Sequence, residues 1–244
     1  MTSNKIYGLI GKELKHSFSP KYFKEKFTKE KILNTEYHLF SLNEIENVLE
    51  LLKNERIHGL NVTIPYKESI IPFLNILDKT AKDIQAVNTI QIKKNKLIGF
   101  NTDVIGFEKS LKPLLKKHHK RALIFGNGGA SKAVAFVLKN LEIPFKIVSR
   151  KSDNLQYSAI DNLLLKEFTI LINTTPLGMF PLIESKPKFD YKGINENHLA
   201  YDLVYNPLET SFLKEAKKQG AFIKNGLEML EIQAEESWKI WNKI

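Results

Sequence analysis

The sequence contains no cysteine among its 244 residues. This absence excludes a disulfide framework, a thiolate nucleophile and a zinc site with cysteine ligands. The six histidines show no HExxH or comparable ligand spacing, so we expect no metal site.

Long apolar runs are also missing. No segment approaches the roughly 20 apolar residues that a membrane-spanning helix needs. The first residues, MTSNKIYGLIGKELKHS, lack the apolar core of a signal peptide. We therefore expect a cytoplasmic protein that does not associate with a membrane.

Arginine is scarce: only Arg56, Arg121 and Arg150 are arginine among 37 basic residues, although the net charge is +10. A nucleic-acid-binding surface gathers its basic residues on one element, whereas these lysines are scattered along the chain. We expect no nucleic-acid partner. The positive charge would instead draw small anionic substrates and cofactors toward the surface.

The residues that are present are typical of a folded globular chain, with 43% hydrophobic and 26% charged residues and a length that allows two modest domains. Short apolar or alternating segments in the first hundred residues predict an α/β domain with a mixed sheet. The predicted strands cover residues 5–11, 35–40 and 57–63, and residues 88–101 form a hairpin.

Two helices are predicted between these strands. The first begins at Ser19 as its N-cap, with Pro20 in the first helical position. The second covers residues 41–54, with a capping box of Ser41 and Glu44. Its apolar face would comprise Leu42, Ile45, Leu49 and Leu52.

The second half of the sequence predicts a different domain. After a helical stretch at 106–119, residues 121–150 read as strand, glycine-rich turn, helix and strand, the length of one βαβ unit. Further strands are predicted at 168–176, 198–205 and 221–226, as in a doubly wound parallel sheet of Rossmann type. A last helix over 226–244 would bury a stripe of Leu230, Ala234, Trp238 and Trp241.

The turn GNGGAS opens the helix of the βαβ unit and carries Gly126, Gly128 and Gly129. Backbone N–H groups and the helix dipole at such a turn can hold a pyrophosphate. The pattern departs from GxGxxG, and a tight turn that needs glycine for steric reasons is the alternative.

The end of the second strand of this unit indicates which dinucleotide fits. An acidic residue there would bind the ribose of NAD, but this chain has Ser149, Arg150 and Lys151. A guanidinium suits the 2′-phosphate of NADP. A surface arginine after a strand is the alternative.

Polar residues gather in three segments of the first domain: NVTIPYK, AVNT and GFNTD. Asn61, Thr63 and Asn88 would offer amide and hydroxyl groups to a polyhydroxylated ligand, and Lys67 and Asp103 could transfer a proton. Each residue alone is a common turn former. The prediction therefore depends on the combination.

These segments resemble the shikimate dehydrogenase family. HSFSP, NVTIPYK, AVNT, GFNTD, GNGGAS, INTTPLGM, YDLVYNPLET and GLEMLEIQA occur in the order seen in that family and cover essentially the whole chain. The resemblance implies an NADP-dependent oxidoreductase that reversibly reduces 3-dehydroshikimate to shikimate in aromatic amino-acid biosynthesis. It also implies a substrate-binding domain of residues 1–103 and 227–244, and an NADP-binding domain of residues 104–226.

Roles follow from the resemblance residue by residue. Lys67 and Asp103 would form the catalytic pair, and Ser17 and Ser19 would bind the substrate carboxylate. The ring hydroxyls would be surrounded by Asn61, Thr63, Asn88, Asp103, Tyr205 and Gln233. The pyrophosphate would be held by Gly126, Asn127, Gly128, Gly129 and Ala130, and the adenosine phosphate by Ser149, Arg150 and Lys151. The rest of the cofactor would lie near Thr174, Met179, Val204, Gly226 and Met229.

The sequence departs from the family at Phe23 and Lys24, where HN is common, and at Glu228, where glycine is usual. Three alternatives stay open: a quinate/shikimate dehydrogenase using NAD, a methylene-tetrahydrofolate dehydrogenase, and a ligand-binding relative without activity. The sequence leaves both a monomer and a homodimer open.

Overall fold

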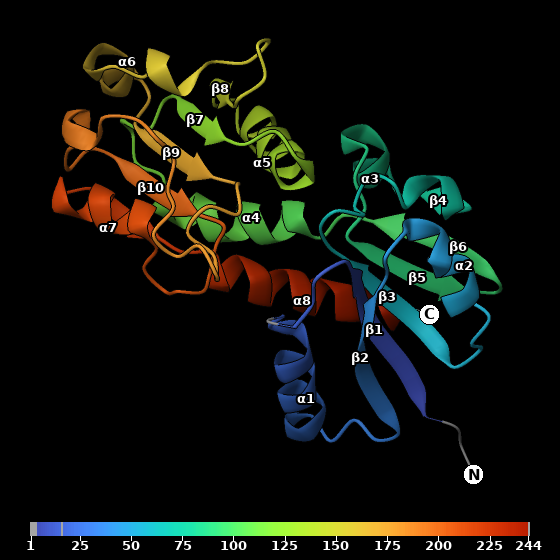
Figure 1. The fold of residues 1–244 in the computed structure, drawn as a ribbon. Coiled ribbons are helices and arrows are strands. Elements are labelled where there is room, and N and C mark those ends of the chain that lie inside the picture. Colours follow the sequence, from blue (N-terminus) through green and yellow to red (C-terminus); the bar gives the residue numbers. More distant parts are fainter. Residues whose placement is uncertain (1–3, 16, 244) are drawn as a thin grey trace. The chain divides into compact units, whose positions relative to one another are not determined.

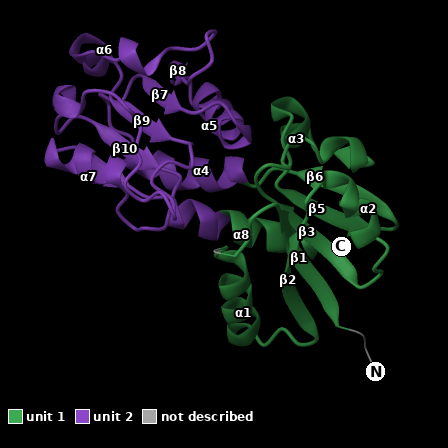
Figure 2. Cartoon of the chain, in the orientation of Figure 1, with its two compact units in different colours: residues 1–102, 233–244 green, residues 103–232 purple. Residues whose placement is uncertain are grey.

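The computed structural model describes residues 4–15 and 17–243, so residues 1–3, His16 and Ile244 lie outside the described residues. The chain divides into two compact units, each coloured separately in Figure 2. Unit 1 comprises Met1–Thr102 and Gln233–Ile244, and unit 2 comprises Asp103–Ile232. Among the described residues, no helix is both long and apolar enough to cross a membrane.

The described part of unit 1 contains a six-stranded mixed sheet in the order β2-β1-β3-β5-β6-β4 (Figure 1). Its strands are β1 (Lys5–Gly11), β2 (Thr35–Ser41), β3 (Ile57–Val62), β4 (Ile76–Leu77), β5 (Thr89–Lys93) and β6 (Lys96–Phe100). β1 is parallel to β2 and β3, whereas β5 is antiparallel to β3 and β6. The predicted strands and hairpin are confirmed, and Lys94 and Asn95 form the hairpin turn with φ of 49° and 59°.

The two faces of this sheet bury different cores because successive side chains of a strand alternate. Ile6 and Ile10 of β1 pack with Leu60 on one face, while Tyr7 packs on the other. The helices of unit 1 are α1 (Ser19–Lys29), α2 (Val48–Leu51) and α3 (Lys79–Ile84). The Tyr7 face is covered by α1 and by the end of α8 (Leu227–Trp241), a helix that begins in unit 2 and ends in unit 1.

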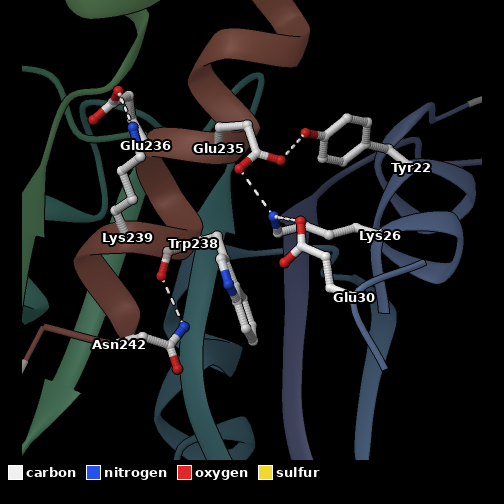
Figure 3. Close-up of polar contacts among 8 residues, drawn as sticks. All are labelled: Tyr22, Lys26, Glu30, Glu235, Glu236, Trp238, Lys239 and Asn242. Carbon is white, nitrogen blue, oxygen red and sulfur yellow. Dashed lines mark hydrogen bonds and ion pairs between the residues drawn. The ribbon is translucent and has the colours of Figure 1, made fainter. Parts of the chain in front are cut away.

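A polar contact joins α1 to the last turns of α8 (Figure 3). Lys26 is 8% exposed, and its Nζ lies 2.6 Å from Glu30 and 2.9 Å from Glu235. Tyr22 donates a hydrogen bond to the same Glu235 carboxylate. Burial by itself lowers the pKa of Lys26, but the two carboxylates outweigh it and the pKa is raised above its ordinary value. The ammonium group therefore stays charged at this helix interface.

The predicted cap at Ser19 is wrong. α1 already begins at Ser19, and Phe18 before it has helical backbone angles and no side-chain cap. Ser19 instead hydrogen-bonds the hydroxyl of Tyr37, on β2. Pro20 is the second residue of α1, one position later than predicted.

The continuous helix predicted over 41–54 is also wrong. Ser41 is the last residue of β2 and pairs with Gly11, so it cannot cap a helix. A 3₁₀ turn at Ile45–Asn47 and the four-residue α2 replace the long helix. Leu49 is 56% exposed, whereas its neighbour Val48 is fully buried.

Unit 2 contains a five-stranded parallel sheet in the order β11-β10-β9-β7-β8. Its strands are β7 (Ala122–Phe125), β8 (Phe145–Val148), β9 (Ile170–Asn173), β10 (Leu199–Asp202) and β11 (Phe222–Lys224). Its helices are α4 (Asp103–Leu111), α5 (Gly129–Asn140), α6 (Asn162–Glu167), α7 (Ser211–Lys218) and the start of α8. The predicted α/β class, with a mixed first sheet and a Rossmann-like second one, is confirmed. The helix predicted at 106–119 starts earlier and ends at Leu111, because Pro113 cannot continue it.

The strand order of unit 2 reverses at β7. From β7 the chain passes to β8 on one side, and then returns to β9 on the other side. In open parallel sheets, ligands bind beyond the carboxyl ends of the strands at such a reversal. A cofactor site in unit 2 is therefore expected beyond the carboxyl ends of β7 and β9.

Candidate active site

The glycine-rich turn lies at this edge, between the end of β7 at Phe125 and the start of α5 at Gly129. Gly126 has φ of +109°, and a Cβ there would lie 2.6 Å from Oγ1 of Thr174. Thr174 in turn donates its hydroxyl to the Phe125 carbonyl at 2.7 Å. Only glycine fits at position 126, where the turns after β7 and β9 meet.

Gly128 differs from Gly126, because a Cβ there would meet nothing within 4 Å. Crowding within the chain therefore does not explain why this residue is glycine. Gly128 is the N-cap residue of α5, and no side chain caps the N-terminus of this helix. Asn127 is exposed, and Gly129 and Ala130 are half-buried. Ser131, in the same first turn, is buried with its Oγ unpaired among the described residues. Open space, uncapped N–H groups and the helix dipole together suit a phosphate ligand.

The residues after β8 form a tight turn. Ser149 is buried, and its Oγ accepts hydrogen bonds from the Lys151 N–H at 3.0 Å and from Asn154 at 2.9 Å. Arg150 and Lys151 are exposed. The serine hydroxyl therefore shapes the turn, and the two cations lie at the surface.

The remaining predicted cofactor residues lie in two loops and at the start of α8. Val204 is buried, and its carbonyl accepts a hydrogen bond from Gly226 at 3.2 Å. A Cβ on Gly226 would lie 2.1 Å from the Leu203 carbonyl oxygen, so this contact requires glycine. Met179 is 45% exposed, whereas Met229 is buried.

In unit 1, three of the predicted substrate residues belong to one buried polar cluster. Asn88 donates to Oε1 of Gln233 at 2.9 Å, and Asn61 donates to the Asn88 carbonyl at 3.2 Å. Ser237 receives a hydrogen bond from Asn61 at 2.9 Å and lies 2.8 Å from Thr89 Oγ1. We call these residues, with Thr102 whose N–H donates to Asn88 at 2.7 Å, the amide cluster.

Tyr37 connects the amide cluster to the serine pair near α1. Its hydroxyl donates to Oδ1 of Asn61 at 2.8 Å and also contacts Ser19. The Oγ of Ser17 accepts the Ser19 N–H at 3.4 Å. Burial raises the pKa of Tyr37, so the phenol remains a neutral donor.

Lys67 and Thr63 lie in the turn that follows β3. Thr63 is fixed by its N–H bond to the Ile10 carbonyl at 2.9 Å. The carbonyl of Lys67 accepts the Val87 N–H at 2.7 Å, which ties this turn to the segment carrying Asn88. Lys67 is half-buried.

Asp103 and Tyr205 belong to unit 2, unlike Lys67. Asp103 is the first residue of α4 and is 2% exposed, and the N-terminal position suits a carboxylate because of the helix dipole. Tyr205 follows Val204 and is half-buried. Within the described residues, no group of three His, Cys, Asp or Glu side chains could hold a metal ion.

Sequence reasoning missed Tyr37, Thr89, Thr102 and Ser237. Ser237 could have been found, because it lies four residues after Gln233 and so on the same helix face. Tyr37 could not, because its neighbour Asn61 lies two strands away across the sheet.

Comparison with known proteins agrees with these features. Residues 9–90 match the model of the shikimate dehydrogenase substrate binding domain. The shikimate dehydrogenase (NADP(+)) of Pelagibacter ubique is 38% identical over 98% of this chain and 94% of its own length. The chain belongs to the shikimate dehydrogenase family.

Solved structures of shikimate dehydrogenases have the same fold. One in complex with NADP+ is 36% identical, with a TM-score of 0.86 over 99% of this chain and 91% of that one. The Thermus thermophilus enzyme in complex with NADP(H) and shikimate is 29% identical, with a TM-score of 0.85 over 98% of this chain and 94% of that one. In this member of the family, Asn61, Lys67 and Asn88 fall within the matched substrate-binding segment, and Gln233 lies outside it.

Proposed function

We propose that this chain is an NADP-dependent shikimate dehydrogenase, which reversibly reduces 3-dehydroshikimate to shikimate in aromatic amino-acid biosynthesis. The observation that carries the proposal is the amide cluster in a chain of this family. A ring with several hydroxyl groups requires paired donors and acceptors, and a site built from them rejects ligands that leave them unpaired.

The substrate side of the proposal uses unit 1. Ser17 and Ser19 are assigned to the carboxylate, because hydroxyl donors at the start of α1 suit an anion. The ring hydroxyls are assigned to Asn61, Thr63, Asn88 and Gln233, together with Asp103 and Tyr205. The substrate-binding part is proposed to comprise residues 1–103 and 227–244, and the NADP-binding part residues 104–226.

The cofactor side uses the edge of the parallel sheet in unit 2. The open N-terminus of α5 and the obligatory glycine at 126 fit a pyrophosphate. Arg150 and Lys151 are assigned to the 2′-phosphate of NADP, which a carboxylate at this position would repel. Thr174, Met179, Val204, Gly226 and Met229 are assigned to the nicotinamide side.

Bound NADPH supplies a hydride from C4 of its nicotinamide ring to the ketone carbon. The ketone oxygen must take a proton at the same time, and we assign that proton to Nζ of Lys67. Asp103 is assigned as the second member of the catalytic pair. The residues assigned to the ring hydroxyls would orient the ketone carbon for hydride transfer.

Steady-state rates with shikimate and with quinate, each with NADP and with NAD, test the proposal. We expect kcat/KM to be highest for shikimate with NADP. Protein carrying Lys67→Ala, purified in the same way, controls for the host's own enzyme. A preference for quinate with NAD would make the chain a quinate/shikimate dehydrogenase, and no turnover of either acid would make it a binding protein.

A further inference from the structure

Asp202 is a buried carboxylate that the proposed mechanism does not use. It is the last residue of β10, between β9 and β11 in the parallel sheet, and its exposure is 0%. Its Oδ1 accepts hydrogen bonds from Asn173 Nδ2 at 2.9 Å and from the Val204 N–H at 3.0 Å. Its Oδ2 accepts the Thr210 hydroxyl at 2.6 Å. One carboxylate therefore satisfies three donors, one at the end of β9 and two in the loop that follows β10.

The first loop follows β9 and is shaped by Asn173. Oδ1 of Asn173 accepts the N–H of Thr175 at 3.1 Å and its hydroxyl at 2.6 Å. The Nδ2 that binds Asp202 also donates to the Leu177 carbonyl at 3.3 Å. The loop carrying Thr174 and Met179 is thus tied to Asp202 through a single amide side chain.

The second loop, residues 203–210, is held at both ends by the same carboxylate. Val204 is bound at its start and Thr210 at its end. Thr210 also caps α7, because its Oγ1 accepts the Leu213 N–H at 3.3 Å. The loops also touch each other: Gly178 has φ of +89°, and a Cβ there would lie 3.1 Å from the Thr210 Cβ.

We propose that Asp202 is a positioning residue for NADP, whose carboxylate fixes the shape of the two loops assigned to the nicotinamide side of the cofactor. This inference rests on the proposed function and deepens it. Asp202 is fully buried and is not assigned a contact with the cofactor. It acts through Val204 and through Asn173, which precedes Thr174.

The chemistry of the contacts explains why a carboxylate is needed. A carboxylate is an acceptor at both oxygens, whereas an amide presents N–H donors on one side. In Asp202→Asn, the amide nitrogen would face either the Thr210 hydroxyl or the N–H donors of Asn173 and Val204, so at least one of the three bonds must be lost or reversed. Burial raises the pKa of Asp202 to about 7, and the bonds from Thr210, Val204 and Asn173 oppose that rise. These bonds offset part of the desolvation cost of the anion, although burial remains the larger effect.

Measuring the binding of two ligands distinguishes a local role of Asp202 from a general loss of structure. NADP uses both halves of the proposed cofactor site, whereas adenosine 2′,5′-bisphosphate carries the phosphorylated adenosine and no nicotinamide. Calorimetric titration of the Asp202→Asn protein should show about tenfold weaker binding of NADP, as expected for one lost hydrogen bond to a charged group. Binding of adenosine 2′,5′-bisphosphate should be unchanged, and the KM for NADP should rise more than kcat falls.

Asp161→Asn is the matched control. Asp161 is an exposed N-cap in the same unit, and asparagine caps a helix equally well. It should bind both ligands as the unchanged protein does. Equal loss of both ligands in Asp202→Asn, or loss of neither, overturns the inference.

A second pair of variants covers the case in which Asp202→Asn fails to fold. Thr210→Ser keeps the hydroxyl that binds Asp202 and should bind NADP with nearly the affinity of the unchanged protein. Thr210→Val removes the hydroxyl and should weaken the binding of NADP without weakening the binding of adenosine 2′,5′-bisphosphate. If the serine and valine variants bind NADP equally, the inference fails. If the unchanged protein binds NADP but turns over neither shikimate nor quinate, the proposed function fails while these binding results still decide the role of Asp202.

Discussion

Lys67 is the single residue on which the proposed chemistry depends most. A protonated amine can deliver the proton that the reduced ketone needs, and general acid catalysis contributes roughly 10² to 10⁴ in rate. Lys67→Ala should therefore lower kcat by about that factor and change the KM for shikimate little. Lys82→Ala, which removes an exposed lysine of the same unit, should leave both constants unchanged. Near-normal turnover in Lys67→Ala would remove the residue from the mechanism.

Arg150 is the residue proposed to select NADP over NAD. Arg150→Asp should raise the KM for NADP by roughly 10- to 100-fold, because a charge-assisted hydrogen bond becomes a repulsion. The KM for NAD should change much less, since NAD has no 2′-phosphate. Lys166→Asp alters the net charge equally at an exposed site of unit 2, and controls for general attraction of anions. Equal changes for the two cofactors would show that Arg150 does not discriminate.

At the residue scale, the sequence predicts which types of side chain matter better than it predicts their contacts. Asn61, Asn88 and Gln233 are far apart in the chain, and the structure joins them in one amide cluster. The hydroxyl of Ser237 within that cluster was not predicted. Its contacts depend on which strands are neighbours and on how α8 lies against them, and neither is a local property of the sequence.

At the scale of elements, the end of α8 is held on unit 1 by close packing against a glycine. A Cβ on Gly59 would lie 2.3 Å from Cδ1 of Trp241, whose Nε1 donates to the Ile90 carbonyl at 3.0 Å. Gly59→Ala must displace the indole and should lower the free energy of unfolding by about 1 to 3 kcal/mol. Because Gln233 lies on the same helix, the KM for shikimate should rise as well.

Chemical denaturation measures the first effect, and initial rates measure the second. Gly128→Ala adds the same methyl group where nothing lies within 4 Å, so it should cost far less stability. An unchanged unfolding midpoint in Gly59→Ala would show that Trp241 does not pack closely against position 59.

The accuracy of the predicted elements follows from how local their causes are. The hairpin β5–β6 and the β7–α5–β8 unit were predicted because alternation and glycine placement act over a few residues. The prediction of a helix over 41–54 was wrong. Ser41, its predicted cap, pairs with Gly11 of β1 and so belongs to β2. Here strand pairing, which acts between residues far apart in the chain, outweighed the local sequence pattern that favours a helix.

At the scale of the whole molecule, the sequence indicates two parts because two kinds of motif follow one another. Polar segments between strands occupy the first part, and the glycine-rich βαβ unit opens the second. The structure has a mixed sheet in one unit and a parallel sheet in the other. The sequence could not show where the last helix changes units, because α8 is continuous across Gln233 and carries no break in its pattern.

The central claim is that the chain transfers a hydride from NADPH to 3-dehydroshikimate, and isotope transfer measures this most directly. The substrate is reduced with NADPH that carries deuterium at one of the two C4 positions, and in a second reaction at the other. We expect one of the two labelled cofactors to yield shikimate with a single deuterium on the newly formed carbinol carbon, seen by mass spectrometry and NMR. The central claim would be contradicted if 3-dehydroshikimate were not reduced with NADPH, or if neither labelled cofactor gave shikimate containing deuterium.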